Sequence, residues 1–228
     1  MHRGLGGVMM KYRSVFDIIG PVMIGPSSSH TAGAARMGQV ARQLFRHEPE
    51  RVSISLYGSF AKTYRGHGTD VALIGGILGF ETDDLRIPEA LDIAKERKIE
   101  VEFIEEDANA PHPNTARIRL YKGEEEIEVV ACSIGGGKIE VVELNGFDLQ
   151  LTGTSPALLI VNNDRFGAIA AVASILAKHE INISTMSVSR KEKGRRALMV
   201  IETDELLADE VIEEINAQQN ICQVTIME

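Results

Sequence analysis

The C-terminal third of the chain, residues 157–228, has a hydrophobic pattern that narrowly limits its fold. Continuous or alternating apolar runs, typical of strands, are separated by two stretches in which apolar residues recur at helical spacing. The expected strands are 157–162, 181–189, 197–202 and 221–227, and the expected helices are 167–179 and 207–216. The order strand–helix–strand–strand–helix–strand predicts a split βαβ, ferredoxin-like arrangement.

The preceding residues predict another domain, in which helices are combined with a mixed or antiparallel sheet. The expected helices are 12–20, 33–46, 71–80 and 88–98, and the expected strands are 51–57 (half-buried), 99–104, 116–122, 125–133 and 138–144. The whole chain is therefore predicted to be an α+β protein. The expected divisions are a disordered leader (1–11), a first domain (12–149), a turn-rich linker (150–156) and a second domain (157–228).

Composition and charge argue against several classes of function. The formal net charge of −9 disfavours a nucleic-acid or anionic-membrane binder, because both rely on basic surfaces. No apolar run is long enough to span a bilayer, and residues 1–8 lack the apolar segment of a signal peptide, so we expect a cytoplasmic protein. The two cysteines, Cys132 and Cys222, are far apart in alternating apolar patterns, so we expect buried thiols and no disulfide framework.

An unusual polar stretch precedes the helix expected at 33–46. Residues 27–31 are Ser, Ser, Ser, His and Thr, and glycines lie on both sides at positions 25 and 33. One hydroxyl is expected there as a helix cap, because the first backbone N–H groups of a helix lack internal partners. The same N–H groups also attract a carboxylate or phosphate. The stretch can therefore be interpreted as a helix cap or as part of an anion-binding site.

Three polar loops each contain one histidine: His30, His67 and His112. Glycines in the loop 58–70 let other groups approach His67, and prolines on both sides of His112 stiffen the loop 109–115. A loop histidine is often only structural, but three in such loops favour a shared site. Three histidines also suit catalytic zinc, although no HExxH spacing accompanies them. A Ser–His acyl-transfer pair is a further alternative, although the GxSxG context is absent.

The motifs of the first domain resemble those of a known family. They are Tyr-Arg-Ser-Val-Phe-Asp-Ile-Ile-Gly-Pro at 12–21, Gly-Pro-Ser-Ser-Ser-His-Thr-Ala-Gly at 25–33, Gly-His-Gly-Thr-Asp at 66–70 and His-Pro-Asn at 112–114. Together and in this order they resemble the beta subunit of iron–sulfur-dependent L-serine dehydratase, of the two-chain bacterial type.

This resemblance implies an enzyme that converts L-serine to pyruvate and ammonia with a [4Fe–4S] cluster. In such an enzyme a cluster iron with an open coordination position acts as a Lewis acid on the substrate hydroxyl. Such clusters are normally held by three or four cysteines, and this chain has two. The resemblance therefore implies an alpha subunit that holds the cluster, no metal ligand on this chain, and a catalytic site at or near the interface of the two chains.

The resemblance also implies roles for single residues. His67 is expected to remove the Cα proton of serine, for which a neutral imidazole is suited near pH 7. His112 and Asn114 are candidates for closing the pocket. The residues expected to bind or orient the substrate carboxylate are Ser27, Ser28, Ser29, His30 and Thr31.

The C-terminal domain resembles an ACT domain. The order of elements, Asp164 followed by Gly167, and Ile181-Asn182-Ile183 match that family, although Phe166 stands where a proline is common. The resemblance implies side-by-side pairing of these domains and an amino-acid effector, for which L-serine is expected. The candidate effector residues are Asn162, Asn163, Asp164 and Asn182. The alternative for the whole chain is a non-catalytic module that senses serine, because a similar domain pair occurs in some phosphoglycerate dehydrogenases.

Overall fold

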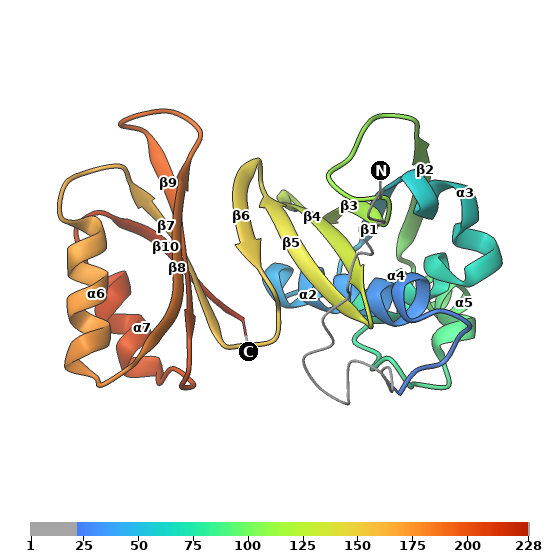
Figure 1. Cartoon of the computed structure of the whole chain (residues 1–228), viewed down its shortest axis with the longest axis horizontal. Coiled ribbons are helices and arrows are strands. Elements are labelled where there is room, and N and C mark those ends of the chain that lie inside the picture. Colours follow the sequence, from blue (N-terminus) through green and yellow to red (C-terminus); the bar gives the residue numbers. More distant parts are fainter. Residues whose placement is uncertain (1–21, 228) are drawn as a thin grey trace, which may run out of the picture.

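The computed structural model of the chain describes residues 22–227, which form two β-sheets with helices on one face of each (Figure 1). This arrangement confirms the α+β class. The leader predicted at 1–11, the helix predicted at 12–20 and the first of the family motifs lie outside the described residues. Figure 1 shows the two sheets next to each other, with the helices of the second sheet on its outer side.

The first sheet has six strands in the order β2-β1-β3-β4-β5-β6. The strands are β1 (Arg51–Tyr57), β2 (Glu100–Glu106), β3 (Thr115–Lys122), β4 (Glu125–Gly135), β5 (Lys138–Leu144) and β6 (Phe147–Leu151). Strands β1 and β2 are parallel, and the other neighbours are antiparallel. A parallel pair needs a long crossover, which the helices between β1 and β2 provide.

The helices of the first domain cover one face of this sheet. They are the π-helical turn η1 (Ser28–Ala32), α2 (Gly33–Phe45), α3 (Gly58–His67), α4 (Thr69–Ile77), the 3₁₀ turn η2 (Ile87–Glu89) and α5 (Ala90–Glu96). Their apolar faces share one core with alternate residues of β1, namely Val52, Ile54 and Leu56. In residues 22–227, no helix is both long and apolar enough to cross a membrane.

Helices α2 and α4 approach each other at two glycines. A Cβ atom on Gly76 would overlap the carbonyl oxygen of Ala35 and lie 2.8 Å from the backbone nitrogen of Gln39. A Cβ atom on Gly38 would overlap the carbonyl oxygen of Leu73. The two helix backbones are therefore in direct contact, which only glycine permits at these positions.

Strand β1 is more deeply buried than its alternating sequence predicts. Ser53 and Ser55 were expected on an exposed face, but both are buried. The reason is that β1 lies between β2 and β3, where Ser55 faces Arg117 and Ser53 faces Arg119. These arginines form ion pairs with carboxylates of β4 and β5 on the same sheet.

The segment 58–70, predicted as a glycine-rich loop, is mostly helical. Helix α3 occupies Gly58–His67, and Gly68 alone makes the turn into α4, with a φ of 65°. The first N–H groups of α3 are bound from a distant part of the chain, because Ser59 and Phe60 both donate to the carbonyl oxygen of Pro113. This long-range cap is not visible in the local sequence.

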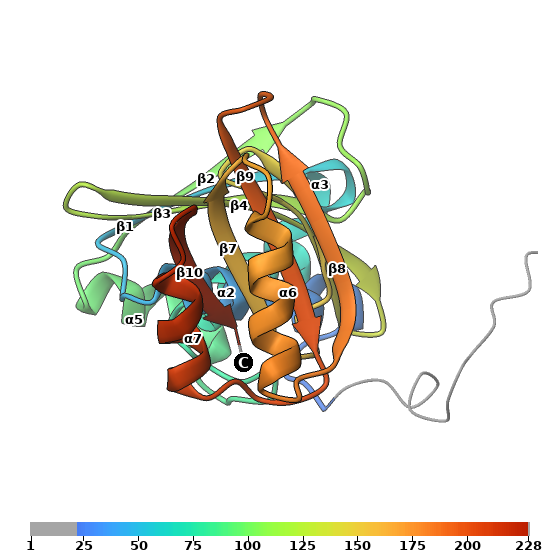
Figure 2. The ribbon, with the colours of Figure 1, turned by 90° about the vertical axis from the view of Figure 1, so that its left-hand side faces the viewer.

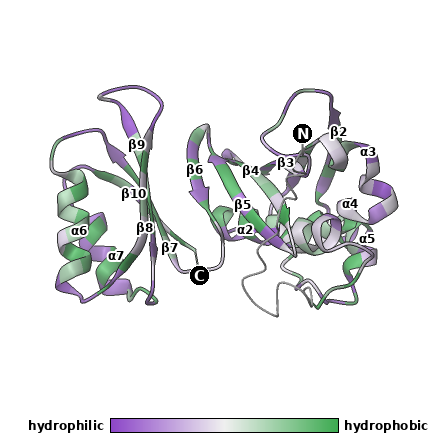
Figure 3. Ribbon diagram, in the orientation of Figure 1, coloured by the Kyte–Doolittle hydropathy of each residue, from purple (hydrophilic) through white to green (hydrophobic). Residues whose placement is uncertain are grey.

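The second sheet confirms the ferredoxin-like prediction. Its strands are β7 (Ala157–Asn163), β8 (Ile183–Arg190), β9 (Arg196–Thr203) and β10 (Ile221–Met227), in the antiparallel order β10-β7-β9-β8. Helices α6 (Ala168–Lys178) and α7 (Asp209–Asn216) lie side by side on one face (Figure 2). Helix α6 is largely hydrophobic, whereas α3 in the first domain has hydrophilic segments (Figure 3).

The other face of the second sheet packs on the first domain. The apolar residues of this face join the core of the first sheet: Ala157, Leu159, Leu198, Val200 and Met227. Strand β6 contacts β8 and β9, and its last two residues lie in the turn-rich linker predicted at 150–156. Strand β6 pairs with β5 and buries the alternate residues Leu149 and Leu151. Part of the expected linker therefore extends the first sheet.

The prediction that both cysteines are buried is correct for Cys132 and wrong for Cys222. Cys132 is in β4, in the interior of the first sheet, and its thiol lies 3.2 Å from the Thr115 hydroxyl. Cys222 is in β10, an edge strand whose pairing with β7 shifts register between Ile221 and Gln223. Such a bulge breaks the inward–outward alternation on which the sequence prediction relied.

We predict that Gly76→Ala destabilises the protein strongly, by roughly 1–3 kcal/mol or more, because the added methyl group has no space between α2 and α4. The matched control is Gly66→Ala in α3, where no atom other than those of the adjacent residues and the helix backbone lies within 4 Å of the added Cβ. This control is expected to be neutral or to stabilise by up to about 1 kcal/mol. Urea unfolding followed by circular dichroism measures both. Equal stability of the two variants would contradict the close helix contact.

We predict that the two thiols differ in reactivity. Cys222 is exposed and should react rapidly with a thiol reagent in the native protein. Cys132 should react only on unfolding, because it is buried and because burial raises the pKa of its thiol. Counting modified thiols with and without denaturant, in the wild type and in Cys222→Ser, checks this. A rapid native reaction of Cys222→Ser would show that Cys132 is accessible.

Candidate functional site

The polar stretch at 27–31 forms a capped helical turn. The Ser27 hydroxyl accepts a hydrogen bond from the backbone N–H of His30 at 3.2 Å, which confirms the expected helix cap. The turn η1 is π-helical and runs directly into α2. A π-helical turn widens the helix locally, and such turns frequently occur at functional sites.

The His30 ring is held at both nitrogens. Its Nδ1 lies 3.1 Å from the Ser29 hydroxyl and 3.4 Å from that of Ser27. Its Nε2 lies 3.0 Å from the hydroxyl of Ser59, at the start of α3. Hydroxyl groups both donate and accept, so these contacts are compatible with either neutral tautomer. The ring also packs edge-on against Phe60, with centroids 5.3 Å apart.

The His67 ring lies against His30. The ring centroids are 4.9 Å apart and the planes cross at 75°. His67 is the last residue of α3, and its backbone carbonyl accepts a hydrogen bond from the buried Thr31 hydroxyl at 3.2 Å. Its Nδ1 atom is buried and has no hydrogen-bond partner among residues 22–227. The structure thus brings together two of the three predicted histidines.

The electrostatic environment keeps His30 neutral. Burial and, to a smaller extent, the neighbouring His67 lower the pKa of His30 below its usual value near 6.5. Burial acts because the charged imidazolium loses solvation, and His67 acts because two adjacent positive rings repel each other. His30 is therefore a neutral hydrogen-bonding group near pH 7.

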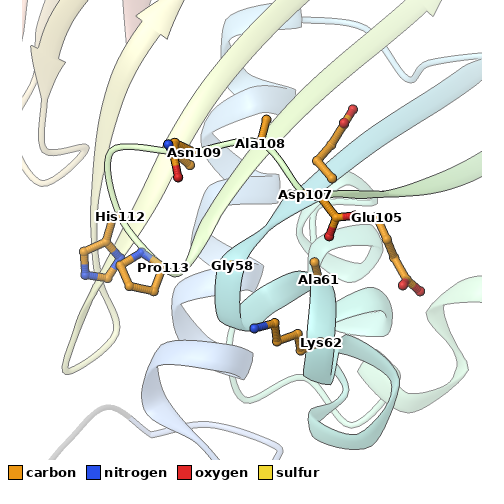
Figure 4. A pocket seen from close by; sticks show the side chains of 11 residues that line it. Gly58, Ala61, Lys62, Glu105, Asp107, Ala108, Asn109, His112 and Pro113 are labelled. Atoms are coloured by element: carbon orange, nitrogen blue, oxygen red, sulfur yellow. The ribbon is translucent and has the colours of Figure 1, made fainter.

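His112 lines a cavity separate from this pair, and Asn114 binds His112 but does not line the cavity. The cavity has a volume of about 380 Å³ and lies between α3 and the loop after β2; its lining includes Lys62, Asp107 and His112 (Figure 4). The His112 Nδ1 accepts a hydrogen bond from the backbone N–H of Asn114 at 3.1 Å. Neither His30 nor His67 lines this cavity. The connection is Ser59, which donates its N–H to Pro113 and contacts His30 with its hydroxyl.

The four candidate effector residues do not all lie together within one chain, because residues 162–164 are consecutive and Asn182 is apart from them. Asp164 accepts hydrogen bonds from the Gly194 N–H (2.8 Å) and from Arg190 (3.0 Å), and these contacts hold its carboxyl pKa below the usual value. It lines a cavity of about 450 Å³. Asn182 lies at the opposite end of the sheet, where it donates to Asp204. Asn162 and Asn163 follow each other at the end of β7, and the Asn162 side chain donates to the Asn163 carbonyl oxygen.

Sequence reasoning missed Ser59, whose hydroxyl the structure places 3.0 Å from His30 Nε2. Its signal is weak: a Gly-Ser pair directly after a strand and in the same polar segment as His67. It also missed two buried hydroxyls near the site, Thr69 at the start of α4 and Ser133 in β4, which have no hydrogen-bond partner in the described part of the chain. The turn η1 contacts both α4 and β4.

The described residues do not provide ligands for an iron–sulfur cluster. Cys132 is buried in the first sheet against Thr115, and Cys222 is exposed at the edge of the second. No group of three or more His, Cys, Asp or Glu side chains is arranged to hold a metal ion in residues 22–227. The donor set therefore does not fit a cluster bound by this part of the chain alone.

The fold and site define a two-domain α+β protein in which a ferredoxin-like domain accompanies a domain with a paired-histidine site. Residues 14–143 match the family model described as serine dehydratase beta chain, and residues 157–219 match the ACT domain. This chain therefore belongs to the serine dehydratase beta chain family and ends in an ACT domain.

Individual relatives agree with this assignment. The chain is 60% identical to a probable L-serine dehydratase beta chain of Bacillus subtilis, over 95% of this chain and 98% of the relative. It is 37% identical to the L-serine dehydratase beta chain of Peptoniphilus asaccharolyticus, over 86% of this chain and 89% of that protein. It is also 29% identical to a D-3-phosphoglycerate dehydrogenase of Bacillus subtilis, over 86% of this chain but 37% of the relative.

We predict that His30 makes the stability depend on pH. Its pKa is lowered in the folded state, so the unfolded chain takes up the proton first as the pH falls. The contribution of His30 to the free energy of unfolding is then fully present above about pH 6.5. It decreases as the pH falls from there through the lower folded-state pKa. His30→Gln keeps a polar group but does not titrate. Between about pH 7.5 and about pH 5.5, the free energy of unfolding measured with urea should decrease less for the variant than for the wild type. The same decrease in both proteins would contradict the prediction.

Proposed function

We propose that this chain is the beta subunit of an L-serine dehydratase and acts with an alpha subunit to convert L-serine to pyruvate and ammonia. Two relatives that match most of this chain are named as beta chains of L-serine dehydratase. These names support both the proposed enzyme and the existence of a partner chain. The composition of the described site supports a proton-transfer step, because it contains two adjacent imidazoles among hydroxyl groups.

The observation that carries the proposal is the difference between the two histidines. Both nitrogens of His30 are engaged by serine hydroxyls, so His30 is fixed as a positioning group. His67 packs against it, and its buried Nδ1 has no partner in residues 22–227. The other nitrogen, Nε2, is then the ring atom that would contact a bound substrate. We assign His67 as the base that removes the Cα proton of L-serine.

The serine run is assigned to the substrate carboxylate. Ser27, Ser28 and Ser29 are half-buried at the start of the helical segment, where hydroxyls and the positive end of the helix dipole favour an anion. Thr31 is buried and donates to the His67 carbonyl oxygen, so its role is to hold His67 in place. His112 is assigned to the wall of the neighbouring cavity, and Asn114, whose backbone N–H donates to His112 Nδ1, is assigned to hold that imidazole. Ser59 joins this loop to the histidine pair through Pro113 and His30.

The [4Fe–4S] cluster of the proposed complex is assigned to the alpha subunit, because the described residues of this chain do not fit it. When bound there, it supplies Lewis-acid chemistry to the leaving hydroxyl. The contribution of this chain is the binding of the carboxylate and the transfer of the Cα proton.

The test is His67→Ala in the complex, co-expressed with the alpha chain under anaerobic conditions. Pyruvate formation from L-serine should fall by about 10²- to 10⁴-fold, the usual contribution of a general base. Exchange of the Cα proton with deuterated water should be lost as well. Subunit assembly, measured by gel filtration, and iron content should be unchanged.

His47→Ala is the matched control, because this imidazole is half-exposed beyond the end of α2 and lies 3.6 Å from the Glu125 carboxylate, away from the histidine pair. Turnover of this variant should equal that of the wild type. Near wild-type turnover and exchange in His67→Ala would show that His67 is not the base.

A second candidate function is a serine-sensing module without chemistry. The relatives named D-3-phosphoglycerate dehydrogenase favour it, because 86% and 85% of this chain match about a third of proteins named for a different reaction. In that case this chain alone would bind L-serine in calorimetry, while the complex with the alpha chain would produce no pyruvate. Pyruvate formation that depends on His67 excludes this function as the whole role of the chain.

We further propose that the ACT domains of two chains pair. Two apolar side chains at the rim of the Asp164 cavity support this, since Phe166 is fully exposed and Ile169 is 46% exposed. Large apolar side chains exposed together are typical of interaction surfaces.

A further inference from the structure

A cleft beside the segment that connects the two domains has no role in the proposed reaction. It has a volume of about 320 Å³ and lies between one face of α2 and the segment 152–154, which joins the first sheet to the second. Arg36, Gln39 and Gln43 line it from α2, at a spacing that places all three on one helix face. Thr152 and Thr154 line it from the other side. The residues of the histidine site and of the Asp164 cavity do not line it.

The charge of the lining is positive. Arg36 is the cation of the cleft, and none of the described residues that line it is acidic. One guanidinium N–H of Arg36 donates to the Gly137 carbonyl oxygen at 3.0 Å, which leaves four of its five N–H groups for other acceptors. Guanidinium groups are well matched to the paired oxygens of a carboxylate or phosphate.

Neighbouring contacts hold the polar side chains in position before any ligand binds. The Gln39 amide donates to the Phe80 carbonyl oxygen at 2.8 Å, and Gly137 fixes Arg36 as described. The Thr152 hydroxyl donates to Glu202 at 3.0 Å, and its oxygen lies 2.9 Å from that of Thr154. A site whose groups are already ordered loses less entropy when it binds a ligand.

Two carboxylates lie just outside the cleft, and both are bound by other donors. Glu202 is buried, and it accepts from Thr152 and from the Thr185 hydroxyl at 2.9 Å. Glu81 accepts from Gln39 at 3.2 Å. These hydrogen bonds hold both carboxylates against lining residues other than Arg36. The Thr154 hydroxyl is exposed and can rotate to donate to a ligand.

We propose that this cleft binds a small oxyanion, a carboxylate or a phosphate, through Arg36 and Thr154. The site is separate from the histidine pair and independent of the proposed reaction. Its ligand would contact the helix that continues from η1 and the segment that leads into β7. An ammonium group has no acidic partner in the lining, so simple anions should bind in preference to zwitterionic amino acids.

The experiment measures binding to the full-length chain with sodium phosphate and sodium pyruvate as probes, L-serine as the zwitterion, and sodium chloride at matched ionic strength. Isothermal calorimetry should detect phosphate or pyruvate, and the melting temperature should rise with its concentration by mass action. Whichever of the two binds more tightly identifies the source of the oxyanion. No heat and no melting shift beyond the chloride control, for either anion, would overturn the proposal.

Substitutions of the lining residues test whether the anion binds in this cleft. Arg36→Gln should weaken binding by about tenfold or more, Arg36→Lys by less because it keeps the charge, and Thr154→Val by a smaller factor. Arg42→Gln is the matched control, since it is on the same helix but does not line the cleft. His67→Ala and Asp164→Ala should bind as the wild type does. Unchanged affinity in both Arg36→Gln and Thr154→Val, or loss of binding in Asp164→Ala, would overturn the assignment to this cleft.

Discussion

The position of the candidate site depends on the backbone contact between α2 and α4. Gly38 and Gly76 let the two helices touch, and each helix begins at a site residue or next to one. The turn with His30 runs into α2, and His67 precedes the single-glycine turn into α4. A larger side chain at either glycine would separate the helices. The 4.9 Å contact of the two rings therefore rests on a packing constraint several turns away from them.

The second domain is joined to the first by both apolar and polar contacts. One face of its sheet shares the core of the first sheet, and Glu202 of β9 binds Thr152 of the connecting segment. Such a buried carboxylate is stable only with hydrogen-bond donors around it, which Thr152 and Thr185 provide. The two domains therefore meet along a continuous core, and helix α2 contributes to that core and continues from the turn η1 of the histidine site.

Much of the fold could be predicted from local patterns, but the exceptions have a common cause. Strands β1 and β10 have the predicted bounds, and the helices α2, α6 and α7 agree within about two residues. The prediction of a loop at 58–70 was wrong because the first N–H groups of α3 are bound by Pro113, which is far away in the sequence. The prediction that Cys222 is buried was wrong because a bulge in β10 changes the face of the sheet on which this residue lies. Both errors arise where a contact between distant segments overrides the local pattern.

The sequence by itself determined the class of the fold, the order of its elements and the histidine and serine residues of the candidate site. These follow from periodicity and from motifs, which need no neighbours in space. Only the tertiary structure decided that His30 and His67 touch, that Ser59 holds His30, and that His112 lines a separate cavity. The physical reason is that ring contacts and shared hydrogen bonds join residues up to 37 positions apart, whose distance is set by how the helices pack and not by local preference.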